Sequence, residues 1–396
     1  MSEPSIPHQS YARLFLRFLR FGFLAWGGPV AQIAMIKREL VEEEKWISVE
    51  RFNRALAVYQ VLPGPEAHEL CVYFGMLARG RIGAILAGLG FMLPGFVLMF
   101  ALSWVYLIFG IRSPLVAAAF AAVQAAVIAL IVRAVHRIGR GALANRWLWA
   151  IAIVSAGAQF FGVHFGITLT FAGLAYALLA GKRYGWASVV TVLCAAAGVG
   201  YVLHFHPTLA VGSAAPVALR TPTQLDLFLS GLKAGLLTFG GAYTVIPFLR
   251  RDAVVTGSWM TDSQFLDGLA LSGTLPAPLI IFATFVGYVG GGPLGAVLLT
   301  VGIFLPAFSF TIIGHSFFER ITQNDRIHKF LDGVTAGVVG LIATAALVLL
   351  REGVGSLPAL GIFVVALVTL YLWHAKRAVL VVVLGAALLG LLINVR

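Results

Sequence analysis

Residues 21–29 read FGFLAWGGP, and residues 234–242 read AGLLTFGGA, a related stretch that lies 213 positions further along the chain. The same offset aligns the Leu-Pro-Gly-Pro element at 62–65 with the Leu-Pro-Ala-Pro element at 275–278. After a deletion of one residue, Gly80 aligns with Gly292. Because matches at this many glycine, proline and aromatic positions rarely arise in one register by chance, the pattern indicates an internal repeat.

The composition is that of a membrane protein. Hydrophobic residues make up 60% of the 396 residues, charged residues only 11%, and the mean hydropathy is +0.94, whereas a soluble domain carries about 25% charged residues. Apolar runs long enough to cross a hydrocarbon core about 30 Å thick recur along the chain, without the alternation of barrel strands. Because lipid offers the backbone no hydrogen bonds, these runs predict an all-α polytopic membrane protein.

Several function classes are disfavoured. The net charge of +12 does not indicate nucleic acid binding, because most basic residues lie in short loops and none forms a stripe interleaved with aromatics. Cys71 and Cys194 are isolated in apolar segments, so we expect neither a disulfide framework nor a metal site. The chain shows no nucleophile, metal cluster or carboxylate pair typical of a membrane-embedded enzyme. We therefore expect neither catalysis nor a cofactor.

About 13 apolar segments are predicted to cross the membrane as helices. They lie near residues 14–36, 55–78, 82–110, 114–135, 146–161, 163–181, 186–205, 228–249, 264–288, 294–317, 330–350, 357–374 and 377–394. The chain then divides into a first repeat (1–185), a linker helix and loop (186–224) and a second repeat (225–396). An odd number of crossings separates the repeats, which predicts two inverted-topology repeats, a common framework of secondary transporters. Lysine and arginine are more numerous in the loops of one membrane face than in those of the other. That face and the N-terminus are therefore predicted to be cytoplasmic.

Glycine and proline interrupt the first two segments of each half, and these breaks are predicted to lie near the membrane midplane. The interrupting residues are Gly27, Gly28 and Pro29 with Gly240 and Gly241 in the first segments, and Pro63, Gly64 and Pro65 with Pro276 and Pro278 in the second. Each new helix start exposes N–H groups and a positive dipole end, which suit an anion. A packing kink is the alternative for any single break. Four breaks at equivalent places favour a substrate site.

Two cations occupy equivalent places before the glycine pairs, because Arg20 aligns with Lys233. Charges inside a membrane are costly and usually functional, and a guanidinium can bind two oxygens of a tetrahedral oxyanion. Both residues are therefore predicted to bind a divalent oxyanion. The alternatives are that Arg20 reaches the interface and that Lys233 pairs with Asp226.

Two acids follow the first Leu-Pro-Gly-Pro element. Glu66 and Glu69 are three residues apart, on one face of the predicted helix. Either could be only a partner of the helix dipole. The alternative hypothesis is proton coupling, because a carboxylate charge beside an anion site opposes anion binding.

Two tryptophans precede helix starts. Trp46 and Trp259 are predicted to anchor the chain at the membrane interface. Thr261 with Gln264 predicts a capping box at the second of these helix starts, whereas Ser48 offers only its first half.

The combination of Phe23-x-x-x-Gly27-Gly28-Pro29, Trp46 before a polar helix start, and Leu62-Pro63-Gly64-Pro65-Glu66 resembles the chromate ion transporter family. The repeat resembles the long form of that family, which has two homologous domains. The resemblance implies export of chromate across the bacterial inner (cytoplasmic) membrane, energised by the proton motive force and conferring chromate resistance, with sulfate as a competing substrate. Ala242, Ala277 and Leu279 replace Pro29, Gly64 and Glu66 in the second half, which implies unequal roles.

Other transport functions remain open at the level of sequence. A sulfate or other oxyanion transporter would share the fold, and an uncoupled anion channel would share the basic site. The many small residues on apolar helices indicate close helix packing, within one chain or in a homo-oligomer.

Overall fold

The computed structural model describes residue 6 and residues 9–26, 28–110, 114–205, 220–239, 241–322, 324–373 and 378–393, with the backbone alone for residues 61 and 315–322. All regular structure in these ranges is helical, which confirms the all-α prediction. Among them, five helices are long and apolar enough to cross a membrane: Glu66–Phe109, Pro114–Ala142, Tyr184–Phe205, Leu279–Gly314 and Asp325–Gly353. Three shorter helices are also apolar. The number of crossings and the inverted orientation of the repeats stay predictions.

The chain forms two compact units. The first unit comprises Met1–Leu130, Leu219–Phe318 and Gly353–Arg396, so it combines parts of both predicted repeats. Its helices are α1 (Tyr11–Phe23), α2 (Gly28–Ile36), α3 (Val49–Val61), α4 (Glu66–Phe109), the start of α5 (Pro114–Ala142), α9 (Gln224–Leu236), α10 (Val245–Arg250), α11 (Asp262–Gly273), most of α12 (Phe282–Thr322), α14 (Leu357–Leu372) and α15 (Ala378–Ile393).

The second unit comprises Ile131–Ala218 and Glu319–Glu352. It contains the rest of α5, α6 (Arg146–Phe160), α7 (Phe165–Ala180), α8 (Tyr184–Phe205) and nearly all of α13 (Asp325–Gly353). Small residues let these helices approach closely: a Cβ atom at Gly340 would lie 2.3 Å from the carbonyl oxygen of Ala152. Such close contacts between backbones are typical of membrane helices.

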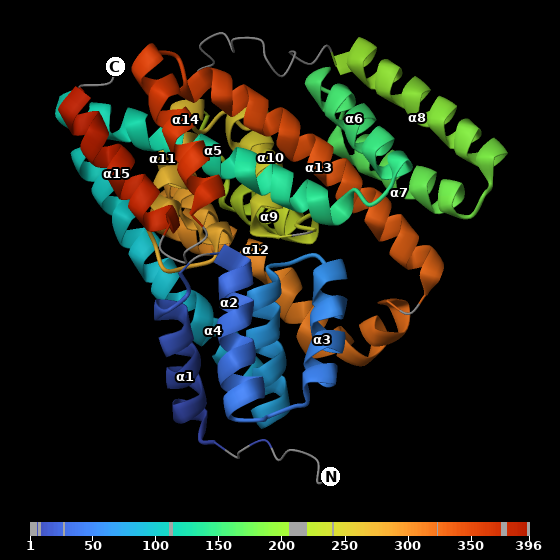
Figure 1. The fold of residues 1–396 in the computed structure, drawn as a ribbon, viewed down its shortest axis with the longest axis horizontal. Coiled ribbons are helices and arrows are strands. Elements are labelled where there is room, and N and C mark those ends of the chain that lie inside the picture. The colour runs from blue at the N-terminus through green and yellow to red at the C-terminus, as the bar shows by residue number, and fades with distance from the viewer. Residues whose placement is uncertain are drawn as a thin grey trace. The chain divides into compact units, whose positions relative to one another are not determined.

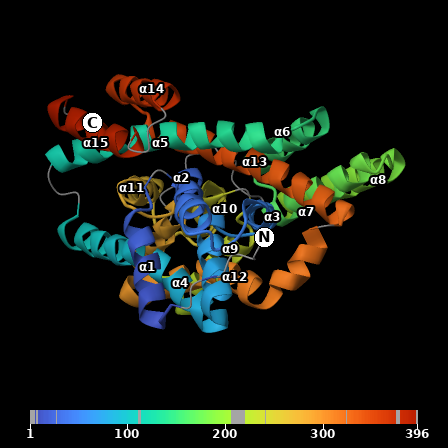
Figure 2. The same ribbon diagram turned by 60° about the horizontal axis from the view of Figure 1, so that its bottom comes forward.

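The first helices of each half are too short to cross a bilayer. Helices α1 and α3 have 13 residues each, α2 has 9 and α11 has 12. A helix of 13 residues is about 20 Å long, whereas the hydrocarbon core is about 30 Å thick. The segments predicted near 14–36 and 55–78 are therefore each divided, as their glycine and proline residues indicate. Helices α1, α2 and α3 all contact α4 (Figure 1), and Figure 2 shows α1, α2 and α4 from a second direction.

Helices α4 and α12 each turn back on themselves at a glycine. In α4 the backbone leaves helical geometry at Arg79 and Gly80, where Gly80 has φ 62° and ψ −154°. In α12 the aligned Gly292 has φ 64° and ψ −153°, and this left-handed region favours glycine. We call residues 66–78 the short arm of α4 and residues 81–109 its long arm. In α12 the short arm is 282–290 and the long arm is 293–322.

The two halves repeat the same packing. A Cβ atom at Gly22 of α1 would lie 2.5 Å from the carbonyl oxygen of Phe91 on the long arm of α4. A Cβ atom at Gly235 of α9 would lie 2.4 Å from the carbonyl oxygen of Ile303 on the long arm of α12. Gly22 aligns with Gly235 and Phe91 with Ile303 in the register of the sequence repeat. The repeat is therefore present in tertiary packing as well as in sequence.

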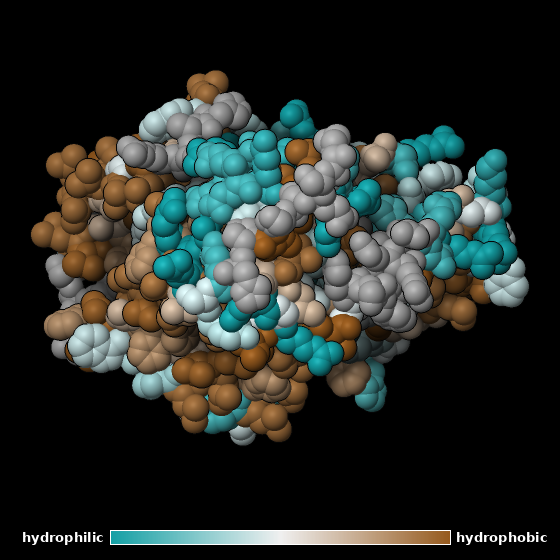
Figure 3. Space-filling view, turned by 90° about the horizontal axis from the view of Figure 1, so that it is seen from below, coloured by the Kyte–Doolittle hydropathy of each residue, from teal (hydrophilic) through white to brown (hydrophobic). Residues whose placement is uncertain are grey.

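Large apolar side chains remain exposed on several helices. On α8 alone, Trp186, Val192 and Leu203 are each 66% exposed. Figure 3 shows one face of the molecule, where apolar side chains gather in broad areas. Apolar surface of this extent is rare on soluble monomers, and the spanning helices with this surface identify a multi-pass membrane protein.

Two local predictions have different outcomes. The capping box of Thr261 and Gln264 is confirmed at the start of α11. The prediction that the tryptophans anchor at the interface is wrong, because Trp46 is 1% exposed and Trp259 7%. Trp46 packs edge-on against Phe74. Both indoles therefore pack in the protein core.

Candidate functional site

Four short non-helical segments, here called the tips, each join two helices of the first unit. They are residues 24–26, 62–65, 237–239 with 241, and 274–278. New helical segments begin after the four tips, at Gly28, Glu66, Ala242 and Leu279, which confirms the four predicted breaks. The predicted site residues Gly27 and Gly240 lie outside the described residues, whereas Pro63, Pro65, Pro276 and Pro278 all lie in tips.

The tips of one half contact the other half. The backbone N–H of Gly64 donates a hydrogen bond of 2.9 Å to the carbonyl oxygen of Thr238. A Cβ atom at Gly64 would lie 3.3 Å from the Cβ of Ala307, and one at Gly95 would lie 2.5 Å from the Cβ of Ala277. Gly64 aligns with Ala277 and Gly95 with Ala307. Each Leu-Pro-x-Pro tip therefore packs on the long arm of the opposite half by the same contact.

Both predicted coupling acids lie at this junction, in the first turn of α4. Glu66 is 9% exposed and Glu69 is fully buried. A Cβ atom at Gly64 would lie 2.9 Å from the carboxyl carbon of Glu69, and one at Gly241 would lie 4.0 Å from Oε1 of Glu66. Neither carboxyl oxygen of Glu69 has a hydrogen-bond partner among the described residues.

Two buried polar residues at the tips were not predicted. The Nε2 of Gln32 donates a hydrogen bond of 2.9 Å to the carbonyl oxygen of Ala25, which ties α2 to the first tip. His68 is fully buried, with ring centroids 4.9 Å from Phe304 and 4.8 Å from Phe308. His68 lies between Glu66 and Glu69 in the sequence, and this position was the signal that could have identified it as a site residue. No local pattern indicated Gln32.

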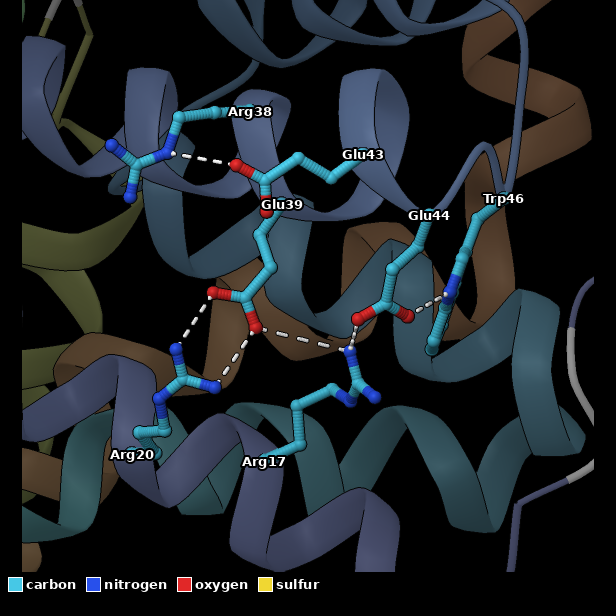
Figure 4. Close-up of polar contacts among 7 residues, drawn as sticks. All are labelled: Arg17, Arg20, Arg38, Glu39, Glu43, Glu44 and Trp46. Carbon is cyan, nitrogen blue, oxygen red and sulfur yellow. Dashed lines mark hydrogen bonds and ion pairs between the residues drawn. The ribbon is translucent and has the colours of Figure 1, made fainter.

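The predicted cation Arg20 lies on α1, ahead of the first tip, and is paired. It donates hydrogen bonds of 3.1 and 3.0 Å to the two carboxylate oxygens of Glu39, which lies on a π-helical turn (Lys37–Glu43) after α2. Arg17 also contacts Glu39, at 3.9 Å, and donates a hydrogen bond to Glu44. Figure 4 shows this network with Trp46, whose indole nitrogen donates to Glu44. Arg17 pairs with Glu44 and Arg20 with Glu39. The segment after the first tip therefore runs antiparallel to α1.

The predicted cation Lys233 has the equivalent position on α9. Its ammonium group pairs with Asp252, and the Ser230 hydroxyl donates a hydrogen bond of 2.7 Å to the same carboxylate. Asp252 lies on a second π-helical turn (Arg251–Thr256). The alternative that Lys233 pairs with Asp226 does not hold, because Asp226 forms a capping box with Thr223. The structure thus gathers Glu66 and Glu69 at the tips and places each cation on the helix that precedes a tip, α1 or α9.

A third acid, Asp267, joins the two halves away from the tips. Asp267 of α11 is 1% exposed and accepts hydrogen bonds of 2.7 Å from the Tyr106 hydroxyl and 2.6 Å from Nε2 of Gln124. These donors belong to α4 and α5. Asp267 is therefore a fully partnered contact between helices of the two halves.

Comparisons with known proteins assign a family. The model of the family described as chromate transporter matches residues 12–219 and 225–391. A chromate transport protein of Pseudomonas aeruginosa is 58% identical over 396 residues, which cover 99% of this chain and 94% of the relative. A chromate transport protein of Cupriavidus metallidurans is 31% identical, over 98% of this chain and 95% of the relative. A probable chromate transport protein of Synechococcus elongatus is 30% identical, over 98% and 96%. No solved structure matches.

Proposed function

This chain belongs to the chromate transporter family, and from that membership we propose that it carries chromate across a membrane. The observation that supports this most strongly is the 58% identity to a named chromate transport protein over nearly the full length of both chains. Sites that open to either side of a membrane in turn are typically formed by broken helices. The four tips of the first unit are proposed to be such breaks.

The proposed direction is export across the inner membrane, with the N-terminus in the cytoplasm. A charge that crosses a membrane gains about 2.3 kcal/mol per 100 mV. A dianion leaving a cell with a negative interior therefore gains about 4.6 kcal/mol per 100 mV. The electrical part of the proton motive force would then favour export, and export would lower cellular chromate and confer resistance.

The repeats are proposed to be inverted, so that each half enters from its own side of the membrane. Helices of about 20 Å would enter, turn at a tip and return, and the tips of both halves would meet near the midplane. The exchanged contacts, Gly64 with Ala307 and Ala277 with Gly95, support a twofold relation between the halves, as in a self-complementary interface. Rocking of one half against the other would then expose the tips to each side in turn.

The dianion is proposed to bind where α1 and α9, which carry the two cations, lead into the tips. Arg20 and Lys233 would supply two positive charges, and the helix starts would supply N–H groups and dipole ends. The residues proposed to line the path are Gly27, Gly28, Pro29, Pro63, Gly64, Pro65, Gly240, Gly241, Pro276 and Pro278. Sulfate has the same charge and tetrahedral shape, so it should compete.

The direct test measures chromate accumulation in cells that express the protein. Expressing cells are expected to hold less chromate than cells with an empty vector, and excess sulfate should reduce the difference. A protonophore should abolish export by a carrier that uses the membrane potential. Equal accumulation at confirmed expression would contradict chromate export and leave a transporter of another oxyanion.

Glu66 and Glu69 are proposed to link transport to protons. An ionised carboxylate at the tips repels a dianion, so proton binding and chromate binding favour each other. Uptake into inverted vesicles should therefore rise as the pH outside the vesicles, on the cytoplasmic face, falls. In Glu69→Gln the permanently neutral amide should remove most of this pH dependence while uptake persists. Asp325→Asn, an exposed acid paired with Lys329, is the control, and an unchanged pH profile in Glu69→Gln would exclude Glu69 as the coupling group.

A further inference from the structure

The ion pairs of Arg20 and Lys233 are one arrangement built twice. In the first half, positions 17 and 20 of α1 contact the carboxylate at 39. In the second half, positions 230 and 233 of α9 contact the carboxylate at 252. All three positions correspond at the 213-residue offset of the repeat, and each cation precedes its carboxylate by 19 residues. The arrangement is therefore a property of both halves.

The backbone around the two carboxylates is also the same. Glu39 and Asp252 each lie on a π-helical turn that directly continues a helix beginning after a tip. π-Helical turns are rare and frequently mark functional sites. Glu39 is 8% exposed and Asp252 is 9% exposed. Buried acids of this kind need a partner, and each has the cation that the transport proposal assigns to the substrate.

The first pair has the geometry of an occupied oxyanion site. The guanidinium of Arg20 donates to both oxygens of Glu39, at 3.0 and 3.1 Å. This two-pronged arrangement is the one by which arginine binds two oxygens of an oxyanion. The Arg20 side chain is 61% exposed, whereas that of Glu39 is 10% exposed. A soluble dianion can therefore approach the guanidinium from the side that Glu39 leaves open.

The second pair is accessible as well. Lys233, Asp252 and Ser230 line a cavity of about 420 Å³. Arg220, Thr256 and Asp226 also line it, so the cavity offers a second cation and a hydroxyl beside the pair, together with a second carboxylate, which caps the start of α9 with Thr223. Such a cavity has room for a tetrahedral oxyanion at the ammonium group of Lys233.

We propose that Glu39 and Asp252 are resident counter-anions, which hold Arg20 and Lys233 in place in the empty transporter and which the transported dianion must displace. This inference rests on the proposed role of the two cations in binding chromate. Each carboxylate is a positioning residue, because it acts on substrate through its cation. When the dianion binds, the cation exchanges one acidic partner for another, and when the carboxylate returns, it helps to expel the dianion. Binding is thereby weakened and release is accelerated.

This exchange has a kinetic signature that a purely structural role lacks. Glu39→Gln and Asp252→Asn keep the shape of each side chain and remove its charge, so the dianion no longer competes with a carboxylate. Chromate uptake into inverted vesicles should then show a KM about tenfold lower and a kcat several-fold lower, since loss of one competing charged contact corresponds to a change of this size. Glu39→Asp retains the charge and should stay close to wild type. Glu43→Gln, on the same π-helical turn but exposed and paired with Arg38, is the matched control.

The outcomes separate this inference from the transport proposal. A KM that is unchanged or higher in both Glu39→Gln and Asp252→Asn, while Arg20→Ala and Lys233→Ala each still reduce uptake about tenfold or more, would overturn the counter-anion role alone. Wild-type uptake in all four variants would instead overturn the role of the cations. Sulfate binding to the purified variants, measured by calorimetry, gives a readout that does not depend on turnover, and tighter binding than in wild type is expected.

Discussion

Chromate export should fall to the level of the empty vector when Arg20 and Lys233 are both replaced by alanine. A hydrogen bond to a charged group contributes about 1.5–3 kcal/mol, which corresponds to about a tenfold to hundredfold loss for each cation. Because the two positions are equivalent in the repeat, each single variant should lose a similar factor and the double variant more than either. Chromate accumulation in expressing cells measures the effect.

The control for this prediction replaces a basic residue outside the network. Arg183→Ala lies in the turn between α7 and α8 of the second unit and should leave export unchanged. Arg20→Lys keeps the charge but loses the two-pronged geometry, so it should retain part of the activity. If the double variant exported chromate as well as wild type at normal expression, Arg20 and Lys233 would not bind the substrate.

Replacing Gly75 by alanine should destabilise the folded protein by about 3 kcal/mol or more, because the contact is with backbone that cannot move aside. The added Cβ would lie 2.3 Å from the carbonyl oxygen of Gly83, where the two arms of α4 pack together. Gly287→Ala should have the same effect, since its Cβ would lie 2.4 Å from the carbonyl oxygen of Gly295. The loss is measured as a lower midpoint of thermal aggregation in detergent.

A helical glycine in open space provides the comparison. Among the described residues, no atom lies within 4 Å of a Cβ added at Gly385 of α15, so Gly385→Ala should be neutral or stabilising by up to about 1 kcal/mol, the difference in helix propensity. Equal midpoints of thermal aggregation for Gly75→Ala and Gly385→Ala would contradict the close packing of the two arms of α4.

The acids make the two halves unequal. Leu279 and Phe282 of the second half stand at the positions of Glu66 and Glu69, and both acids lie where the Gly64 tip meets Thr238 and Gly241 of the other half. Any proton coupling at the tips is therefore expected to act through the first half. The sequence predicted this inequality, because the repeat register compares the halves position by position.

The candidate site was only partly predictable. Proline and glycine have local backbone effects, so the breaks could be located from sequence. The partners of Arg20 could not, because Glu39 lies 19 positions away and contacts it only after the chain reverses at the tip. The same reason hid the burial of Trp46, which depends on Phe74, and the enclosure of His68 by Phe304 and Phe308 of the opposite half.

The sequence by itself determined that the chain is helical, apolar enough for a membrane, duplicated and broken at four equivalent places, because composition, periodicity and backbone restrictions act locally. It also determined which residues of the two halves are equivalent. Only the tertiary structure decided what each of those residues contacts. The backbone N–H of Gly64 donates a hydrogen bond to Thr238 of the other half, and each cation pairs with a carboxylate that follows it by 19 residues in its own half. Contacts between distant segments depend on how short helices reverse and pack, and the free energy of that packing is set by many side chains at once.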